Sequence, residues 1–306
     1  MSIVELHNIS KSFGKVQALQ NVTLKVDAGE LYGFIGPDGA GKTTLFRILT
    51  TLLTPDEGVG SVLDLDVVND YKQIRPKLGY MPGRFSLYQD LTVEENMQFF
   101  ATVFNTTIEE NYDLVKPIYS QLEPFKDRFA GKLSGGMKQK LALSCALIHK
   151  PELLLLDEPT TGVDAVSRKE FWEMLALLKD EGITIVVSTP YMDEAEQCDR
   201  VALIDKGQIM HIDSPKNVIS SFKDALYGIK HPSKNSLITA LREYPYAKSV
   251  QPFGEFVHYT DQREEVSGPE LLDFLKSKNL DEVEIATIQP NIEDVFMELM
   301  EEQNHE

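Results

Sequence analysis

The residues whose types and spacing point most directly to chemistry form a glycine-rich run, GPDGAGKTT, that begins at Gly36. Its first eight letters fit the pattern G-x-x-x-x-G-K-[ST], in which a curled backbone turns successive N–H groups toward phosphate oxygens. The lysine reaches the β- and γ-phosphates of a nucleotide, and the hydroxyl after it is a ligand for Mg²⁺. The residues that the run assigns to this site are Gly36, Pro37, Asp38, Gly39, Ala40, Gly41, Lys42, Thr43 and Thr44, with Thr43 also assigned to the metal.

The residues on either side of this run distinguish two interpretations of it, a phosphate-binding site and a glycine-rich turn of some other α/β protein. The apolar residues 31–35 predict a strand before it, and residues 44–52 predict a helix after it. The start of a helix adds the positive end of its dipole to the cradle of amides. The strand, the helix and the Lys-Thr pair together indicate binding of a nucleoside triphosphate.

A second run, LLLLDE, supplies two carboxylates. Its four leucines predict a buried strand, and Asp157 and Glu158 come directly after them. Asp157 is placed to hold Mg²⁺ through water, and Glu158 is placed to act as general base on an attacking water. A strand that ends in Asp-Glu is weak evidence alone, but after a phosphate cradle it indicates hydrolysis.

Apolar runs and amphipathic segments alternate around these motifs, which predicts an α/β fold with a mostly parallel sheet. Thr92 and Glu95 fit a capping box at the start of one helix, and residues 165–179 predict another. The expected strands are residues 3–7, 22–26, 31–35, 78–81, 153–157, 184–188 and 201–204.

The composition changes after Asp224, which predicts two domains, residues 1–222 and 223–306. Strands are expected at residues 225–230, 249–252, 256–260 and 283–288, and helices at 236–243 and 269–278. This β-α-β-β-α-β order is the ferredoxin-like split pattern of a small α+β domain. Asn235 is expected to cap the first of these helices, and a last amphipathic helix is expected from Ile292.

A third run, LSGGMKQK, contains Ser134, Gly135 and Gly136 at the expected start of a helix. With the other two runs in this order, the chain resembles the nucleotide-binding subunit of an ABC transporter over about residues 3–220. The resemblance implies a P-loop NTPase fold with a helical subdomain that carries this signature run. It also implies ATP and Mg²⁺ as ligands, with two sites formed across a head-to-tail dimer. In the family, the signature loop binds the γ-phosphate held by the second nucleotide-binding subunit.

The resemblance assigns two further residues. Phe13 occupies the position of the aromatic residue that stacks on adenine, where the alternative is a core phenylalanine. Asp164, in TTGVD, matches the loop that touches the opposite subunit. The segments FSLYQDLTVEEN and PNIEDVFMEL resemble the exporter-type branch with a small C-terminal domain. FSLY is expected near the surface that receives a membrane subunit, or else packs internally.

Two positions depart from the family. Gly83 stands where the family has a glutamine that contacts Mg²⁺ and water, and Pro190 stands where it has a histidine that contacts the γ-phosphate. Neither residue supplies the missing side chain, and proline also lacks a backbone N–H. Losing one such group costs ~10²–10³ in rate. The sequence therefore predicts tight ATP binding, weak hydrolysis at the chain's own site and an intact signature loop for a partner's site.

Composition narrows the partners of this 306-residue chain. A net charge of −18 and a pI near 4.8 argue against nucleic acid as the main ligand and against adhesion to anionic lipid. The two cysteines, Cys145 and Cys198, have no metal-ligand spacing, and neither a secretory signal nor a spanning stretch is evident.

The resemblance implies integral membrane permease subunits as partners and a cytoplasmic position, peripheral on the inner face of the cell membrane. The expected function is ATP hydrolysis that drives export through those subunits. The first alternative is a non-catalytic nucleotide sensor that regulates a partner. The second is an ABC ATPase acting on nucleic acid or ribosomes, which the acidic single copy disfavours.

Overall fold

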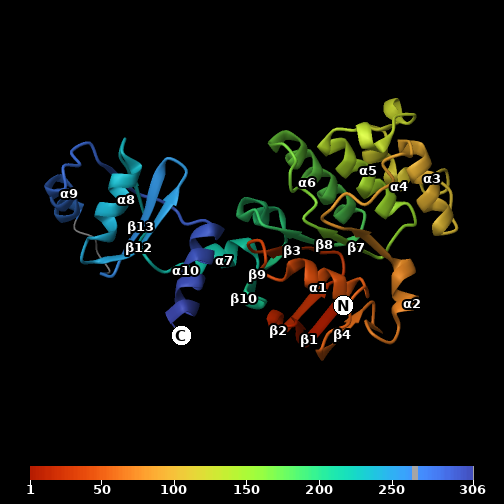
Figure 1. Ribbon diagram of the computed structural model, residues 1–306, viewed down its shortest axis with the longest axis horizontal. Coiled ribbons are helices and arrows are strands. Elements are labelled where there is room, and N and C mark those ends of the chain that lie inside the picture. The colour runs from red at the N-terminus through yellow and green to blue at the C-terminus, as the bar shows by residue number, and fades with distance from the viewer. Residues whose placement is uncertain (264–267, 306) are drawn as a thin grey trace. The chain divides into compact units, whose positions relative to one another are not determined.

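The computed structural model describes residues 1–263 and 268–305. They divide into two compact units, Met1–Lys216 and Asn217–Glu306, and each unit is described by itself (Figure 1). The division falls a few residues before the boundary expected after residue 222. The helices of the first unit are α1 (Lys42–Leu49), α2 (Tyr71–Ile74), α3 (Val93–Val103), α4 (Tyr112–Tyr119), α5 (Gly135–Leu147) and α6 (Ala165–Asp180), and the boundary between the units falls within α7 (Pro215–Ser220).

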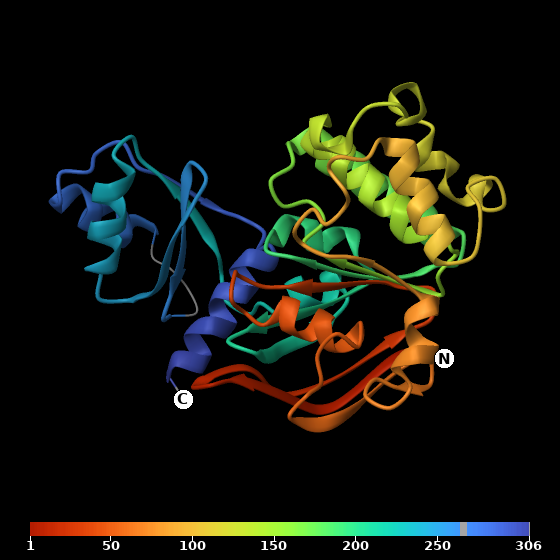
Figure 2. The same ribbon diagram turned by 45° about the vertical axis from the view of Figure 1, so that its right-hand side comes forward.

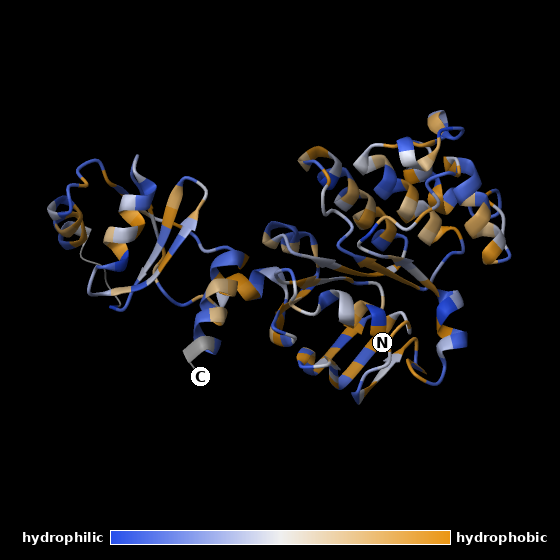
Figure 3. Ribbon diagram, viewed as in Figure 1, coloured by the Kyte–Doolittle hydropathy of each residue, from blue (hydrophilic) through white to orange (hydrophobic). Residues whose placement is uncertain are grey.

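A six-stranded sheet forms the centre of the first unit, in the order β10-β9-β3-β8-β7-β6. Every neighbouring pair is parallel except the antiparallel pair β10 and β9. β3, β7 and β8 are buried along their whole length, as their apolar runs predict, and Figure 3 shows hydrophobic colour along these strands. The strands are β3 (Leu31–Ile35), β6 (Leu78–Met81), β7 (Leu153–Asp157), β8 (Thr184–Thr189), β9 (Arg200–Asp205) and β10 (Gln208–Asp213).

A second, antiparallel sheet has the order β2-β1-β4-β5 and contains β1 (Ser2–Phe13), β2 (Val16–Asp27), β4 (Glu57–Val62) and β5 (Leu65–Asp66). The expectation that residues 3–7 and 22–26 belong to the parallel sheet is therefore wrong. β1 and β2 pair antiparallel and are separated by only two residues, which a parallel crossover cannot achieve. Exposed and buried residues alternate along β2, as in a strand with one solvated face.

Helix α1 lies between the two sheets, which Figure 2 shows from the side. Its Leu45, Phe46, Ile48 and Leu49 belong to the hydrophobic core that also contains side chains of β1, β2, β3 and β7. Helix α6 packs against β3 and β8. The phosphate-binding run is thus held between a strand and a helix that are both fixed by core packing.

The remaining helices of this unit form a group in which α5 packs against α3 and α4. The expected capping box is confirmed at the start of α3: the Glu95 backbone N–H donates to Thr92 Oγ1, and the Thr92 N–H donates to Glu95 Oε2. This group carries the signature run at the N-terminus of α5.

The described residues of the second unit form a four-stranded antiparallel sheet in the order β12-β13-β11-β14. This is the strand order of the ferredoxin-like pattern, and it confirms the expected β-α-β-β-α-β arrangement. The elements are β11 (Tyr227–Lys230), α8 (Lys234–Arg242), β12 (Ala247–Phe253), β13 (Phe256–Asp261), α9 (Gly268–Ser277), β14 (Glu284–Thr287) and α10 (Ile292–His305).

The expected cap at Asn235 is wrong. Helix α8 begins at Lys234 with Ser233 as its N-cap residue, so Asn235 is the second residue inside the helix. Helix α10 begins at Ile292 as expected. There, Asn291 Oδ1 accepts from the Asp294 N–H, and Asp294 Oδ2 accepts from the Asn291 N–H.

Candidate functional site

The glycine-rich run connects the end of β3 to the start of α1 and is shaped by its glycines. Gly39 and Gly41 have φ values of 83° and 104°, a left-handed region that favours glycine. A Cβ at Gly36 would lie 2.0 Å from the carbonyl oxygen of Ile204 on β9. Crowding by the sheet and the turn of the backbone therefore both require glycine in this cradle.

Lys42, the first residue of α1, is 3% exposed. Its Nζ donates to the carbonyl oxygens of Gly36 at 2.8 Å and Pro37 at 3.0 Å, and it lies 3.1 Å from Glu158 Oε1. The structure thus brings the expected phosphate-binding cation and the expected general base into direct contact.

The two expected magnesium ligands are also adjacent. Thr43 Oγ1 donates to Asp157 Oδ1 at 3.2 Å, and Ser188 Oγ donates to the same carboxylate oxygen at 2.7 Å. A hydroxyl and a carboxylate are the hard oxygen donors that Mg²⁺ prefers, and Mg²⁺ keeps water and phosphate as its other ligands. The side chains present at this point therefore fit the metal.

Glu158 follows β7 with a φ of 50°, a left-handed backbone conformation that is strained for a residue with a side chain. Its N–H is shared between the carbonyl and the hydroxyl of Ser188, at 3.1 and 3.0 Å. The side chain is 22% exposed and faces a hollow of about 490 Å³ that Gly39, Gly41 and Lys42 also line. The carboxylate is thus accessible to a water near the phosphate cradle.

Phe13 is the last residue of β1 and is 48% exposed, so it is not a core phenylalanine. It is not among the residues that line the hollow, but Val16, Gln17 and Ala18 are. The hollow therefore extends from the phosphate cradle toward the turn beside Phe13. An exposed aromatic ring near this end suits stacking on a base.

Ser134 is the N-cap of α5, where its Oγ accepts from the Met137 N–H at 3.3 Å. Ser134 and Gly135 are exposed, whereas Gly136 is buried. A Cβ at Gly136 would lie 2.6 Å from Ser167 Oγ, so α5 and α6 approach closely there. Within the described chain the signature residues do not line the hollow around Lys42.

Asp164 caps α6, since its Oδ1 accepts from the N–H groups of Val166 and Ser167 at 3.1 and 3.0 Å. Hydrogen bonds from Ser167 hold the pKa of the Asp164 carboxyl below its usual value. Asp164 is exposed, and Val166 beside it is 69% exposed. This tip presents an apolar and a charged side chain to its surroundings.

Gly83 lies against the magnesium end of the site. A Cβ there would be 3.1 Å from the backbone oxygen of Asp157 and 3.8 Å from its Oδ2. A longer side chain at this position would start beside Asp157, the expected magnesium ligand, and glycine leaves that contact unmade. Arg84 beside it is exposed.

Pro190 follows β8, and the side chains next to it have other partners. Thr189 Oγ1 donates to Glu194 Oε2, and the Tyr191 ring lies 4.6 Å from the guanidinium carbon of Arg168. Both neighbours of Pro190 are therefore engaged by other residues of this chain.

Sequence reasoning missed two residues of this site, Ser188 and Glu194. Ser188 is fully buried between Asp157 and the Glu158 backbone, and Glu194 is buried beneath Thr189. The sequence signal for Ser188 is its hydroxyl near the end of an apolar strand. In the structure, the register of β7 and β8 places Ser188 beside Asp157. Glu194 gave no local signal, because it lies in an acidic run of a short 3₁₀ helix, Met192–Gln197.

Comparison with known proteins agrees with this geometry. Residues 19–161 match the protein family described as ABC transporter. The chain is 33% identical over 304 residues to the Nod factor export ATP-binding protein I of Sinorhizobium fredii, covering 97% of this chain and 85% of that protein. It is 36% identical over 305 residues to the probable multidrug ABC transporter ATP-binding protein YbhF of Escherichia coli. It covers only 52% of YbhF, so the chain spans about half the length of that relative.

Solved structures give the same result. An ATP-binding subunit of an ABC transporter superposes with a TM-score of 0.65 at 27% identity, covering 72% of this chain and 93% of that one. A dimeric ATP-binding cassette in a post-hydrolysis state, bound to ADP and Pi, gives a TM-score of 0.62 at 28% identity, covering 69% and 98%. Within the described residues, no helix combines the length and apolar character needed to cross a bilayer.

Proposed function

Because this chain belongs to the family of ABC transporter ATP-binding proteins, we propose that it binds MgATP at the Lys42 hollow and drives export through separate membrane subunits. One observation carries the proposal. At the start of α1 and the end of β7, Lys42 forms an ion pair with Glu158 and Thr43 forms a hydrogen bond with Asp157. This is the set that a triphosphate, a magnesium ion and an attacking water require.

The roles follow from position. Amides of residues 36–44 and Lys42 Nζ hold the β- and γ-phosphates, and Phe13 stacks on the adenine. Thr43 Oγ1 and Asp157 hold Mg²⁺, whose charge neutralises the phosphate oxygens when it is bound. Glu158 accepts a proton from the attacking water at its carboxylate.

The chain's own site hydrolyses ATP weakly in this proposal. The positions of Gly83 and Pro190 supply no side-chain donor, and Thr189 and Tyr191 are engaged elsewhere. Binding depends on the cradle, which is complete. We therefore expect affinity for MgATP without the turnover of a complete site.

A second nucleotide-binding subunit completes the arrangement, either another copy or a different chain. The exposed Ser134 and Gly135 are presented to a γ-phosphate held by that partner, and the exposed Asp164 tip faces it. Integral membrane permease subunits are the second class of partner and place the chain on the inner face of the cell membrane. Export is favoured because the named relatives include export and multidrug proteins.

The test combines binding and turnover on the full chain. Calorimetry with MgATP should show binding, and Lys42→Ala should weaken it by an order of magnitude or more. Hydrolysis by the chain alone should be slow and should vanish in Glu158→Gln. The alternative, a nucleotide sensor without catalysis, predicts that Glu158→Gln changes nothing because no hydrolysis exists to lose. Absence of binding in the unmodified chain would refute both.

A further inference from the structure

Glu194 is a buried carboxylate that joins two loops of the site. It is 3% exposed, and its Oε2 accepts from Thr160 Oγ1 at 3.0 Å and from Thr189 Oγ1 at 2.5 Å. A carboxylate accepts bonds at several lone pairs, so one side chain can fix two segments that are remote in sequence. Here a single oxygen links the segment after β7 to the end of β8.

The two threonines flank the groups that the chemistry needs. Thr160 lies two residues after Glu158, and Thr189 directly precedes Pro190. The Thr189 carbonyl also accepts from the Gly36 N–H at 3.3 Å, which ties it to the first residue of the cradle. Glu194 is therefore bonded to one residue near the proposed general base and to another that contacts the first residue of the cradle.

The other carboxylate oxygen faces a helix. Glu194 Oε1 has no hydrogen-bond donor among the described residues and lies 3.7 Å from Arg168 Nη1 on α6. Arg168 directly follows Ser167, the side chain that approaches Gly136 of the signature run. The same carboxylate is thus linked, through Arg168, to the helix that supports the signature loop.

Backbone strain makes this support necessary. Glu158 has a φ of 50°, and a non-glycine residue keeps such a conformation only where its surroundings hold it. With glycine at 83 and proline at 190, neither position offers a side chain that restrains the Glu158 carboxylate. Ser188 holds the Glu158 N–H, and Thr160, bonded to Glu194, holds the segment that follows.

We propose that Glu194 is a positioning residue for ATP hydrolysis, which fixes the Glu158 segment and the Pro190 turn and links both to α6 through Arg168. The proposal rests on the proposed function. It assigns no contact between Glu194 and the nucleotide. Glu194 acts on the rate through the placement of Glu158, where a displacement of about 1 Å costs ~10²-fold.

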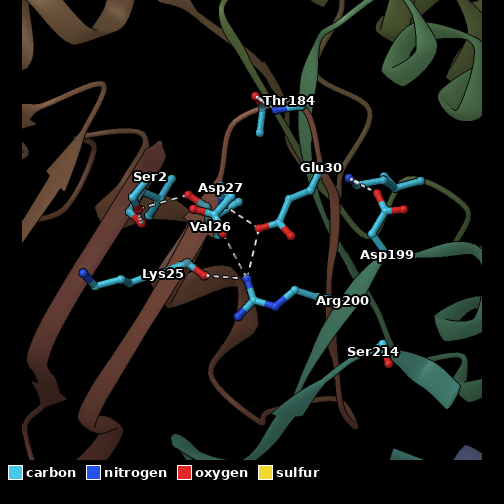
Figure 4. A network of polar contacts seen from close by, with 12 residues as sticks. Ser2, Lys25, Val26, Asp27, Glu30, Thr184, Asp199, Arg200 and Ser214 are labelled. Carbon is cyan, nitrogen blue, oxygen red and sulfur yellow. Dashed lines mark hydrogen bonds and ion pairs between the residues drawn. The ribbon is translucent and has the colours of Figure 1, made fainter. Parts of the chain in front are cut away.

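The test compares Glu194→Ala and Glu194→Gln with matched substitutions at Glu30. Glu30 is a partly buried carboxylate that accepts from the Asp27 N–H and Arg200 Nη1, in the polar network of Figure 4. It is not bonded to Thr160 or Thr189, so Glu30→Ala and Glu30→Gln control for the loss of a paired carboxylate. Single-turnover hydrolysis of radiolabelled MgATP gives the rate, calorimetry gives affinity, and hydrogen exchange reports residues 158–164 and 188–192.

Glu194→Ala should lower kcat about tenfold or more, while KM and the MgATP affinity stay within about twofold. The kcat of Glu194→Gln should lie between those of the unmodified chain and Glu194→Ala. Its amide oxygen still accepts from both hydroxyls, but the charge that faces Arg168 is lost. Thr160→Val added to Glu194→Ala should cause little further loss, because both substitutions remove the same hydrogen bond. Hydrogen exchange in residues 158–164 and 188–192 should become faster in Glu194→Ala and should stay unchanged in the Glu30 variants.

Two results would overturn the positioning role: equal losses of kcat in the Glu194 and Glu30 variants, or a change confined to KM. Failure of the unmodified chain to bind MgATP would instead refute the proposed function. If Glu194→Ala fails to fold, Glu194→Gln and Thr160→Val keep the test decisive, because the first removes the charge that faces Arg168 and the second removes the hydrogen bond between Thr160 and Glu194. Unchanged kcat and unchanged exchange in both would reject the proposal.

Discussion

Lys42 Nζ lies 3.1 Å from Glu158 Oε1, so the proposed phosphate-binding cation and the proposed general base meet at the same hollow. Two backbone carbonyls hold the Lys42 amine in addition. In the proposed function, this pair places a positive charge for the γ-phosphate beside a negative charge for the attacking water. Replacing Lys42 should therefore weaken ATP binding, whereas neutralising Glu158 should not weaken it.

Glu158→Gln should abolish the residual hydrolysis and leave MgATP binding equal or tighter. The amide cannot take a proton from water, and removing a carboxylate charge next to the γ-phosphate relieves like-charge repulsion. Single-turnover hydrolysis and calorimetry on the same preparation measure both effects. Weaker binding in this variant would contradict the assigned geometry.

Lys42→Ala should reduce MgATP affinity by an order of magnitude or more, since the side chain supplies the cation of the cradle. Lys77→Ala is the matched control, because Lys77 forms a surface ion pair with Glu152 and is 44% exposed. Calorimetric titration distinguishes the two variants. Equal affinities would mean that the triphosphate binds elsewhere.

Gly83→Gln combined with Pro190→His should raise kcat, by ~10² if the groups act as they do in complete sites. A Cβ at Gly83 would lie 3.1 Å from the backbone oxygen and 3.8 Å from Oδ2 of Asp157, so a side chain there starts beside the expected metal ligand. Gly83→Ala supplies the Cβ without the amide and is the control. If the double variant binds MgATP with unchanged turnover, the explanation for weak hydrolysis is wrong.

Stability should fall in mildly acid solution because of His149. Burial lowers the pKa of His149 below its ordinary value of 6.5, even though Nε2 lies 2.9 Å from the Leu78 carbonyl oxygen. Its Nδ1 is buried without a hydrogen-bond partner, and the ring stacks on Phe104 at 3.7 Å between centroids. A second proton on this ring would have no acceptor among the described residues.

The sign follows from linkage. As pH falls below about 6.5, the unfolded chain takes up a proton that the folded His149 resists, so the free energy of unfolding decreases. His149→Phe keeps a stacking ring and removes the titration. Urea unfolding between pH 5 and 7.5 should show wild type losing stability relative to this variant as pH falls. Parallel curves would contradict the prediction.

Much of the fold followed from local pattern. The continuous apolar runs of β3, β7 and β8 predicted buried parallel strands, and the cradle and Asp157 lie at the ends of two of them. The strands missed or misplaced were β1, β2, β4 and β5, because hairpin pairing depends on partners that a single run does not identify. The alternation in β2 carried the signal of a half-exposed strand.

The candidate site was predicted less completely from the sequence than the fold was. Motifs identify residues whose neighbours in the chain share the same task, such as Lys42 and Thr43. Ser188 and Glu194 act across the sheet, 31 and 34 residues from their partners Asp157 and Thr160. Only the register of β7 and β8 and the turn after β8 bring them together.

The glycine at position 36 has a consequence for mutational studies of this chain. Any side chain there would collide with the β9 backbone at Ile204, so a replacement disturbs the sheet before it touches a ligand. If substitutions at position 36 abolish function, the loss therefore reports misfolding of the chain. Loss of nucleotide recognition should be inferred from positions such as Thr44, a half-buried residue that lines the hollow.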